Sequence, residues 1–154
     1  MKSQKGFSLV ELLVVVIIIA IIAAIAIPNL LASRRAANEA SAIASLRTVH
    51  SAQVTYQSTQ GKGTDFGDFA ALTGAPDNLL DPTFSGATVT KAGYTFAMTK
   101  TAATTYCVTA EPAAGAGTRD FGIDWTGVVQ FGAVAGTVSC AAGDVIAGGT
   151  TLGQ

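Results

Sequence analysis

Charged residues are scarce in this sequence, and neither sign dominates. Asp, Glu, Lys and Arg make up only 12% of the 154 residues, and the formal net charge is −1. Binding to a nucleic-acid backbone depends on basic residues that neutralise phosphates. The composition therefore excludes nucleic acid as a partner recognised through charge.

The side chains that usually carry catalysis are also few and isolated. His50 is the only histidine, lies in a segment expected to be helical, and has no cysteines or paired carboxylates near it in the sequence. Ser8, Ser33 and Ser51 lack the base and the orienting acid that a nucleophile needs. We therefore expect no catalytic residue, no cofactor and no metal site, and we do not interpret the chain as an enzyme.

Two pairs of aspartates are the only candidates for a calcium site. Asp65 and Asp68 form one pair and Asp77 and Asp81 the other. Neither segment matches the ligand spacing of an EF-hand loop. We expect these residues to be solvated aspartates in turns, with calcium ligation as the alternative.

Cysteine is limited to Cys107 and Cys140, both in the polar part of the chain. An even number of cysteines is consistent with a disulfide in an oxidising compartment. The alternative is two separate buried thiols. We favour the disulfide, which also favours placing this part of the chain outside the cytoplasm.

What the chain does have is one long apolar run that contains a single acid. The run extends from Phe7 to Ile27, and Glu11 is its only charged residue. A carboxylate in hydrocarbon costs a few kcal/mol, so it marks a functional site and needs a partner. If the chain is cut after Gly6, the new amine of Phe7 is such a partner. Between parallel helices, a stagger of four residues, about 6 Å, would bring one chain's amine to its neighbour's carboxylate.

The start of the chain resembles the class III signal segment of type IV pilins and type II secretion pseudopilins. The resemblance rests on the leader 1–5, the segment Gly6-Phe7-Ser8-Leu9-Val10-Glu11, and an apolar helix interrupted by Pro28. It implies that a prepilin peptidase cuts between Gly6 and Phe7 and methylates the amine of Phe7. It also implies that Glu11 is the assembly carboxylate and that identical subunits polymerise through the apolar helix.

The resemblance also implies partners and a location. We expect a single-pass precursor in the inner membrane with a cytoplasmic N-terminus, an inner-membrane assembly platform, and then an extracellular pilus. The alternative is a periplasmic pseudopilus of a type II secretion system. The apolar run would also be compatible with a secretory signal peptide cut near Ala32-Ser33, a plain membrane anchor, or an enzyme or sensor tethered by one span, and we favour these interpretations less.

The apolar helix is expected to continue beyond its proline. Pro28 cannot donate an amide and clashes with the preceding turn, so we expect a kink or lost hydrogen bonds near residues 24–28. The helix should then resume to about Ser58, before the breakers at residues 61–63. Residues at spacings of three and four predict an amphipathic stripe that packs against a sheet: Ile43, Leu46, Val49, Gln53 and Tyr56.

The remaining residues predict a small head of α+β class. Residues 59–92 read as an irregular connection with a helical turn at 65–72. Alternating apolar residues predict strands around 94–98 and 106–110, and residues 125–127 predict a hairpin turn between two more. We therefore expect an antiparallel sheet of three or four strands, packed against the long N-terminal helix, and a tail after Cys140 with little to bury.

The predicted organisation is thus a leader (1–6), an apolar transmembrane or filament-core helix (7–28), an amphipathic helix (29–60) and a head (61–154). Loss of Lys2 and Lys5 with the leader would change the formal net charge from −1 to −3. Arg34, Arg35 and Glu39 follow Pro28. Two interpretations of them stay open here, an Arg35–Glu39 pair within the helix and pairing between neighbouring chains.

Overall fold

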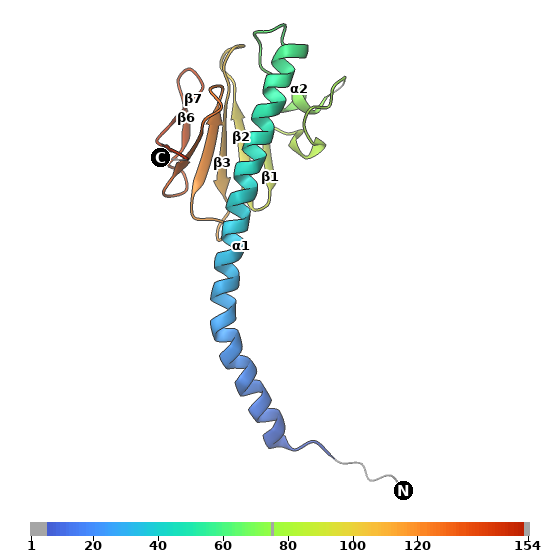
Figure 1. Ribbon diagram of the computed structural model, residues 1–154, viewed down its shortest axis with the longest axis vertical. Coiled ribbons are helices and arrows are strands. Elements are labelled where there is room, and N and C mark those ends of the chain that lie inside the picture. Colours follow the sequence, from blue (N-terminus) through green and yellow to red (C-terminus); the bar gives the residue numbers. More distant parts are fainter. Residues whose placement is uncertain (1–5, 75, 153–154) are drawn as a thin grey trace. The chain divides into compact units, whose positions relative to one another are not determined.

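The computed structural model describes residues 6–74 and 76–152, so the predicted leader lies outside the described residues except for Gly6. The chain divides into two compact units, Met1–Arg34 and Arg35–Gln154. One helix, α1 (Leu9–Thr59), contributes residues to both units. Figure 1 labels the elements of both units.

The class of the fold is α+β, as predicted. In the part of the chain that the structure describes, helix α1 is followed by a short helix α2 (Phe69–Thr73), a 3-10 turn (Pro82–Phe84) and eight strands. The strands are β1 (Thr88–Lys91), β2 (Tyr94–Thr99), β3 (Cys107–Pro112), β4 (Asp120–Asp124), β5 (Val129–Gly132), β6 (Ser139–Ala141), β7 (Val145–Ala147) and β8 (Thr150–Thr151).

The first unit is the apolar part of α1. The helix includes Pro28 and continues beyond it, so the predicted resumption of the helix is confirmed. This part is long and apolar enough to cross a membrane, and none of the most apolar window is buried. A helix that is apolar on all sides is stable only where other apolar side chains or lipid cover it.

The second unit has a core between α1 and one sheet. The predicted stripe on α1 lies in this core: Leu46, Val49 and Gln53 are fully buried, and Ile43 and Tyr56 pack partly buried at its margin. The alternating residues of β2 and β3 face the same core, as predicted, with Tyr94, Phe96, Val108 and Ala110 fully buried. In Figure 1 the upper part of α1 lies along the sheet.

The main sheet is larger than predicted. It has six antiparallel strands in the order β1-β2-β3-β4-β5-β8, where three or four were expected. The predicted hairpin is present, because β4 pairs with β5 across the turn at residues 125–128. The two additional strands are at the edges, where short segments without a strong apolar alternation gain hydrogen bonds from a neighbour.

The C-terminal tail also differs from the prediction that it has little to bury. Strands β6 and β7 form a separate two-stranded sheet. Val138 and Ile146 of this region pack with Cys107 in a second, small core. A Cβ atom at Gly122 would lie 2.4 Å from Ile146 Cδ1, so glycine in the middle of β4 permits this close packing. Strand β4 is consequently buried on both faces.

The connection between α1 and the sheet is mostly irregular, as predicted. Helix α1 ends at Thr59, directly before the expected breakers. The predicted helical turn at 65–72 forms later and shorter, as α2, because Asp68 caps it by accepting a hydrogen bond from the Ala71 amide at 2.7 Å.

Candidate functional site

The predicted processing and assembly residues lie at the start of α1. Gly6 and Phe7 precede the helix and are exposed, and Phe7 is 82% exposed. The Ser8 amide donates to Glu11 Oε2 at 3.1 Å, and the Val10 amide donates to Ser8 Oγ at 3.3 Å. Ser8 and Glu11 thus form a capping box, in which each side chain satisfies an otherwise unpaired helix amide.

This capping box was missed in the sequence analysis, although Ser-x-x-Glu before an apolar run is a recognisable signal. In the uncleaved chain the Glu11 carboxylate therefore already has one donor within its own helix. Its second oxygen has no hydrogen bond within the described residues. The negative charge at the helix start is also favoured by the helix dipole.

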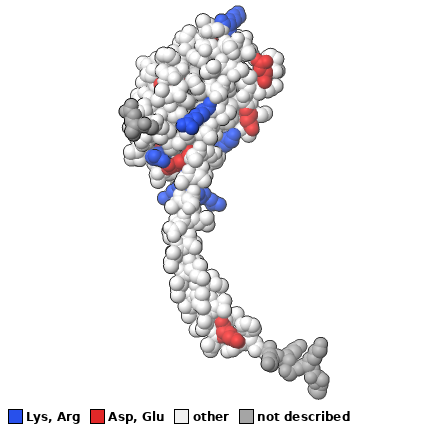
Figure 2. Space-filling view, in the orientation of Figure 1, with Lys and Arg blue, Asp and Glu red and all other residues white. Residues whose placement is uncertain are grey.

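The surface that follows Glu11 is apolar on all sides. The large hydrophobic side chains from Phe7 to Leu31 are exposed, and the least exposed of them, Leu31, is still 47% exposed. A monomeric soluble protein rarely exposes an apolar patch of this extent. Figure 2 shows the corresponding stretch of uncharged surface after an acidic side chain near the start of the helix.

Pro28 lies within this apolar surface, and the two polar residues that follow it, Asn29 and Ser33, donate hydrogen bonds to the helix itself. Asn29 donates its side-chain amide to the Ile25 carbonyl at 3.1 Å, and Ser33 donates to the Asn29 carbonyl at 3.0 Å. Because Pro28 has no amide, the Ala24 carbonyl loses the donor that would normally lie four residues on. These side-chain bonds keep Asn29 and Ser33 compatible with an apolar environment.

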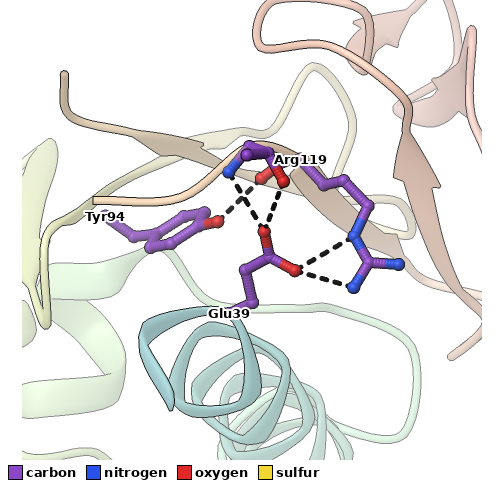
Figure 3. Close-up of polar contacts among 4 residues, drawn as sticks. Glu39, Tyr94 and Arg119 are labelled. Carbon is purple, nitrogen blue, oxygen red and sulfur yellow. Dashed lines mark hydrogen bonds and ion pairs between the residues drawn. The ribbon is translucent and has the colours of Figure 1, made fainter. Parts of the chain in front are cut away.

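A buried carboxylate, Glu39, joins α1 to the loop before β4. Its Oε1 accepts hydrogen bonds from the amide and the hydroxyl of Thr118, at 3.0 and 2.9 Å. Its Oε2 accepts two hydrogen bonds from Arg119, from Nε at 3.0 Å and Nη2 at 2.7 Å. Tyr94 completes the cluster by donating its hydroxyl to the Arg119 carbonyl at 2.7 Å. Figure 3 shows these contacts around Glu39.

The Arg35–Glu39 pair considered within the helix is therefore wrong. Both Glu39 oxygens are used by Thr118 and Arg119, and Arg119 binds through two nitrogens of its planar guanidinium. Burial by itself raises the pKa of Glu39. The hydrogen bonds from Thr118 and Arg119, together with the Arg119 charge, outweigh burial and hold that pKa below its ordinary value.

The predicted disulfide is present. Cys107 at the start of β3 is bonded to Cys140 in β6, with the Cα atoms 5.8 Å apart. It links the two-stranded sheet covalently to the six-stranded sheet. The alternative of two separate thiols is wrong for this structure.

Comparison with known proteins agrees with the geometry at the start of the chain. Residues 1–27 match the prokaryotic N-terminal methylation motif. The chain is also 37% identical over 127 residues to the type IV wide pilus major component PilA4 of Thermus thermophilus, and the match covers 80% of this chain and 88% of that protein. This chain belongs to the type IV pilin family.

The head of this pilin uses three buried aspartates to hold its C-terminal region. Asp120 accepts from the Val138 amide at 2.7 Å, and Asp124 accepts from the Ile146 amide at 3.1 Å. Asp144 accepts from the Thr101 amide and the Thr105 hydroxyl, each at 2.7 Å. Local sequence patterns do not reveal these three roles, because the donors lie 18 to 43 residues away along the chain.

His50 of the pilin has a structural position. Its Nδ1 lies within hydrogen-bond distance of the Tyr106 hydroxyl, and its ring packs where a Cβ atom at Gly127 would lie 2.6 Å from Nε2. Burial lowers the pKa of His50, and the charge of Asp124 opposes that shift. These contacts join α1, the residue before β3 and the hairpin turn, so His50 contributes to packing between these elements.

The four aspartates considered for calcium each accept a hydrogen bond within the described residues. Asp68 caps α2, and Asp81 caps the 3-10 turn by accepting from the Thr83 amide at 2.8 Å. Asp77 accepts from the Gln60 side chain at 3.0 Å, and Asp65 accepts from the Thr64 hydroxyl at 3.0 Å. Asp68 and Asp81 thus cap helical turns, and Asp65 and Asp77 accept hydrogen bonds from other side chains.

Proposed function

We propose that this chain is a structural subunit of a type IV pilus, polymerised through the apolar part of α1. The observation that carries the proposal is the uncovered apolar surface from Phe7 to Leu31, with the single carboxylate of Glu11 at its start. Such a surface requires lipid before assembly and other apolar helices afterwards. The relative in Thermus thermophilus, a major component of a type IV wide pilus, supports this assignment over the pseudopilin alternative.

The proposal includes cleavage and methylation of the precursor before assembly. A prepilin peptidase cuts between Gly6 and Phe7 and methylates the amine of Phe7, consistent with the methylation motif matched at residues 1–27. The precursor crosses the inner membrane once with its N-terminus in the cytoplasm, and an assembly platform moves it into the filament. Gly6 and Phe7 precede the first helical residue and are exposed, so the bond to be cut lies outside the helix.

The Glu11 carboxylate then selects the register of assembly. Apolar helices exchange lipid for one another with little change in free energy, because lipid tails are as apolar as leucine. Specificity must come from a polar contact. A neighbour's Phe7 amine is a charged donor that reaches Glu11 when parallel helices are staggered by about 6 Å. In an apolar environment this charge pair is much stronger than in water.

Substitutions at Glu11 test the proposal. Glu11→Ala removes both the capping-box acceptor and the charge, whereas Glu11→Gln keeps a side chain that can cap Ser8 but has no charge. We expect Glu11→Ala to insert and to be cut after Gly6 as the wild type does, but to give few or no filaments. Glu11→Gln should give an intermediate yield. The measurement compares subunit in the membrane fraction with subunit in sheared filaments.

Two controls separate the charge from helix capping and from general stability. Ser8→Ala weakens the capping box and leaves the carboxylate, so its filament yield should stay near that of the wild type. Glu111→Ala removes an exposed carboxylate from β3 in the head and should also assemble normally. A normal filament yield from Glu11→Ala would show that Glu11 does not determine assembly.

A further inference from the structure

Two consecutive arginines on α1, Arg34 and Arg35, are exposed and have no acidic partner among the described residues. Glu11 and Glu39 are the only acids on α1, and Glu39 is occupied by Arg119 and Thr118. Within residues 6–74 and 76–152, the ion pair that forms is the one between Glu39 and Arg119, and neither Arg34 nor Arg35 takes part in one. Two adjacent positive charges are thus available to an external anion.

The distance along the helix places these arginines at a membrane boundary. From Leu12 to Leu31 the helix has no charged residue, and these residues rise about 30 Å, which matches the hydrocarbon thickness of a bilayer. Glu11 comes directly before this stretch, and Arg34 comes just after it. Asn29 and Ser33, the polar residues near its end, each donate a side-chain hydrogen bond to a carbonyl of the helix, which lowers the cost of placing them near hydrocarbon.

Basic residues lie on both sides of the apolar run. Lys2 and Lys5 precede the apolar run and Arg34 and Arg35 follow it. Basic residues close to a span are normally concentrated on its cytoplasmic side. With the N-terminus in the cytoplasm, Arg34 and Arg35 lie on the opposite side and oppose this bias. An anion at that surface would offset their cost, and lipid phosphate is the anion present there.

We propose that Arg34 and Arg35 bind the phosphate groups of anionic phospholipids in the outer leaflet of the cytoplasmic membrane. This inference rests on the proposed function, because it takes the membrane orientation from it. Guanidinium groups bind phosphate through paired hydrogen bonds. The contact fixes the depth of the unassembled subunit, with Glu11 held at the cytoplasmic boundary and out of the bilayer centre until a neighbour's amine meets it.

Lipid selectivity of the full precursor tests this site without requiring filaments. The chain is reconstituted into nanodiscs with equal amounts of phosphatidylglycerol and phosphatidylcholine, and native mass spectrometry counts the lipids retained on each chain. The wild type should retain phosphatidylglycerol preferentially. Each basic residue at an anionic surface contributes roughly 1 kcal/mol, a factor of about five. Arg34→Gln/Arg35→Gln should therefore lower the preference by roughly twenty- to thirtyfold.

Two further variants make the comparison specific. Arg47→Gln removes another exposed arginine of α1 that lies beyond Glu39, and it should keep the wild-type preference. Arg34→Lys/Arg35→Lys keeps the charge without the paired geometry and should keep part of the preference. Because every variant retains Lys2 and Lys5, the leader contributes equally to all of them.

The inference is overturned if the wild type shows no preference for phosphatidylglycerol, or if Arg34→Gln/Arg35→Gln keeps the wild-type ratio. If that double variant keeps the ratio but gives no filaments, the arginines pair between chains instead, and the proposed function stands. If the wild type itself gives no filaments, the proposed function fails, whatever the lipid preference is.

Discussion

At the scale of single residues, Glu39 shows how a carboxylate is made part of a pilin head. It is one of the few acids in the sequence, is only 7% exposed, and receives four hydrogen bonds from Thr118 and Arg119. A carboxylate at this depth would be unfavourable without such donors. Its contacts hold the loop before β4 against α1.

Removing the guanidinium from this cluster should destabilise the head. Arg119→Met leaves Glu39 buried with only Thr118 as donor, and hydrogen bonds to a charged group contribute about 1.5 to 3 kcal/mol. Because the Arg119 side chain is 41% exposed, the lower end of this range is expected. The melting temperature of the full chain in detergent should fall by roughly 6 °C at neutral pH. Arg35→Met, which removes an arginine without an ion pair, is the matched control and should change it little.

The same cluster predicts the response to acid. The folded pKa of Glu39 lies below its ordinary value of 4.5, so its stabilisation is present above that pH and is lost as the pH falls through the folded pKa. In Arg119→Met, burial is less opposed, so the Glu39 contribution should already be lost at a higher pH. If Arg119→Met and the wild type have equal melting temperatures from neutral pH down to pH values below the ordinary pKa of Glu39, the role given to the Glu39–Arg119 pair is contradicted.

At the scale of elements, the sequence predicted best where apolar periodicity is long. The stripe from Ile43 to Tyr56 and the alternation in β2 and β3 report a core directly, because burial follows the period of the element. Strand β1 and strand β8 were not predicted. Each is a short edge strand, and it forms because a neighbouring strand offers unpaired backbone groups, which a local pattern does not reveal.

The residues at the start of α1 could be predicted from the sequence, whereas the partner of Glu39 could not. Phe7, Glu11 and Pro28 lie within one short segment, so their pattern was visible in the sequence. The Glu39–Arg119 pair joins residues separated by 80 positions, and local charge spacing suggested Arg35 as the partner instead. The choice between the two arginines depends on where the loop before β4 folds, which is a property of the tertiary structure.

The disulfide gives a prediction for the C-terminal elements. Cys107 and Cys140 are 33 residues apart, and closing a loop of this length contributes about 3.8 kcal/mol on the chain-entropy formula. Reductant should therefore lower the melting temperature of the full chain by roughly 15 °C or more. The variant Cys107→Ala/Cys140→Ala should melt at one temperature with or without reductant. Two reactive thiols in the native wild-type protein would refute the bridge.

At the scale of the whole molecule, the two units have opposite relations to solvent. Residues 35–152 contain a closed core of aromatic and aliphatic side chains, with polar groups held by Glu39, Asp120, Asp124 and Asp144. In the apolar part of α1, none of the most apolar window is buried by the rest of the chain. One unit buries its apolar side chains in a core, and the other leaves its apolar side chains uncovered. This arrangement is expected of a subunit that polymerises through the helix.

The most direct test of this account is the intact mass of the subunit in sheared, purified filaments. We expect one species that begins at Phe7 and carries a single N-terminal methyl group, with Cys107 and Cys140 still bonded. This result requires cleavage after Gly6, methylation and assembly together. A filament subunit that retains Met1, or one that begins near Ser33 and has lost the apolar helix, would contradict the account.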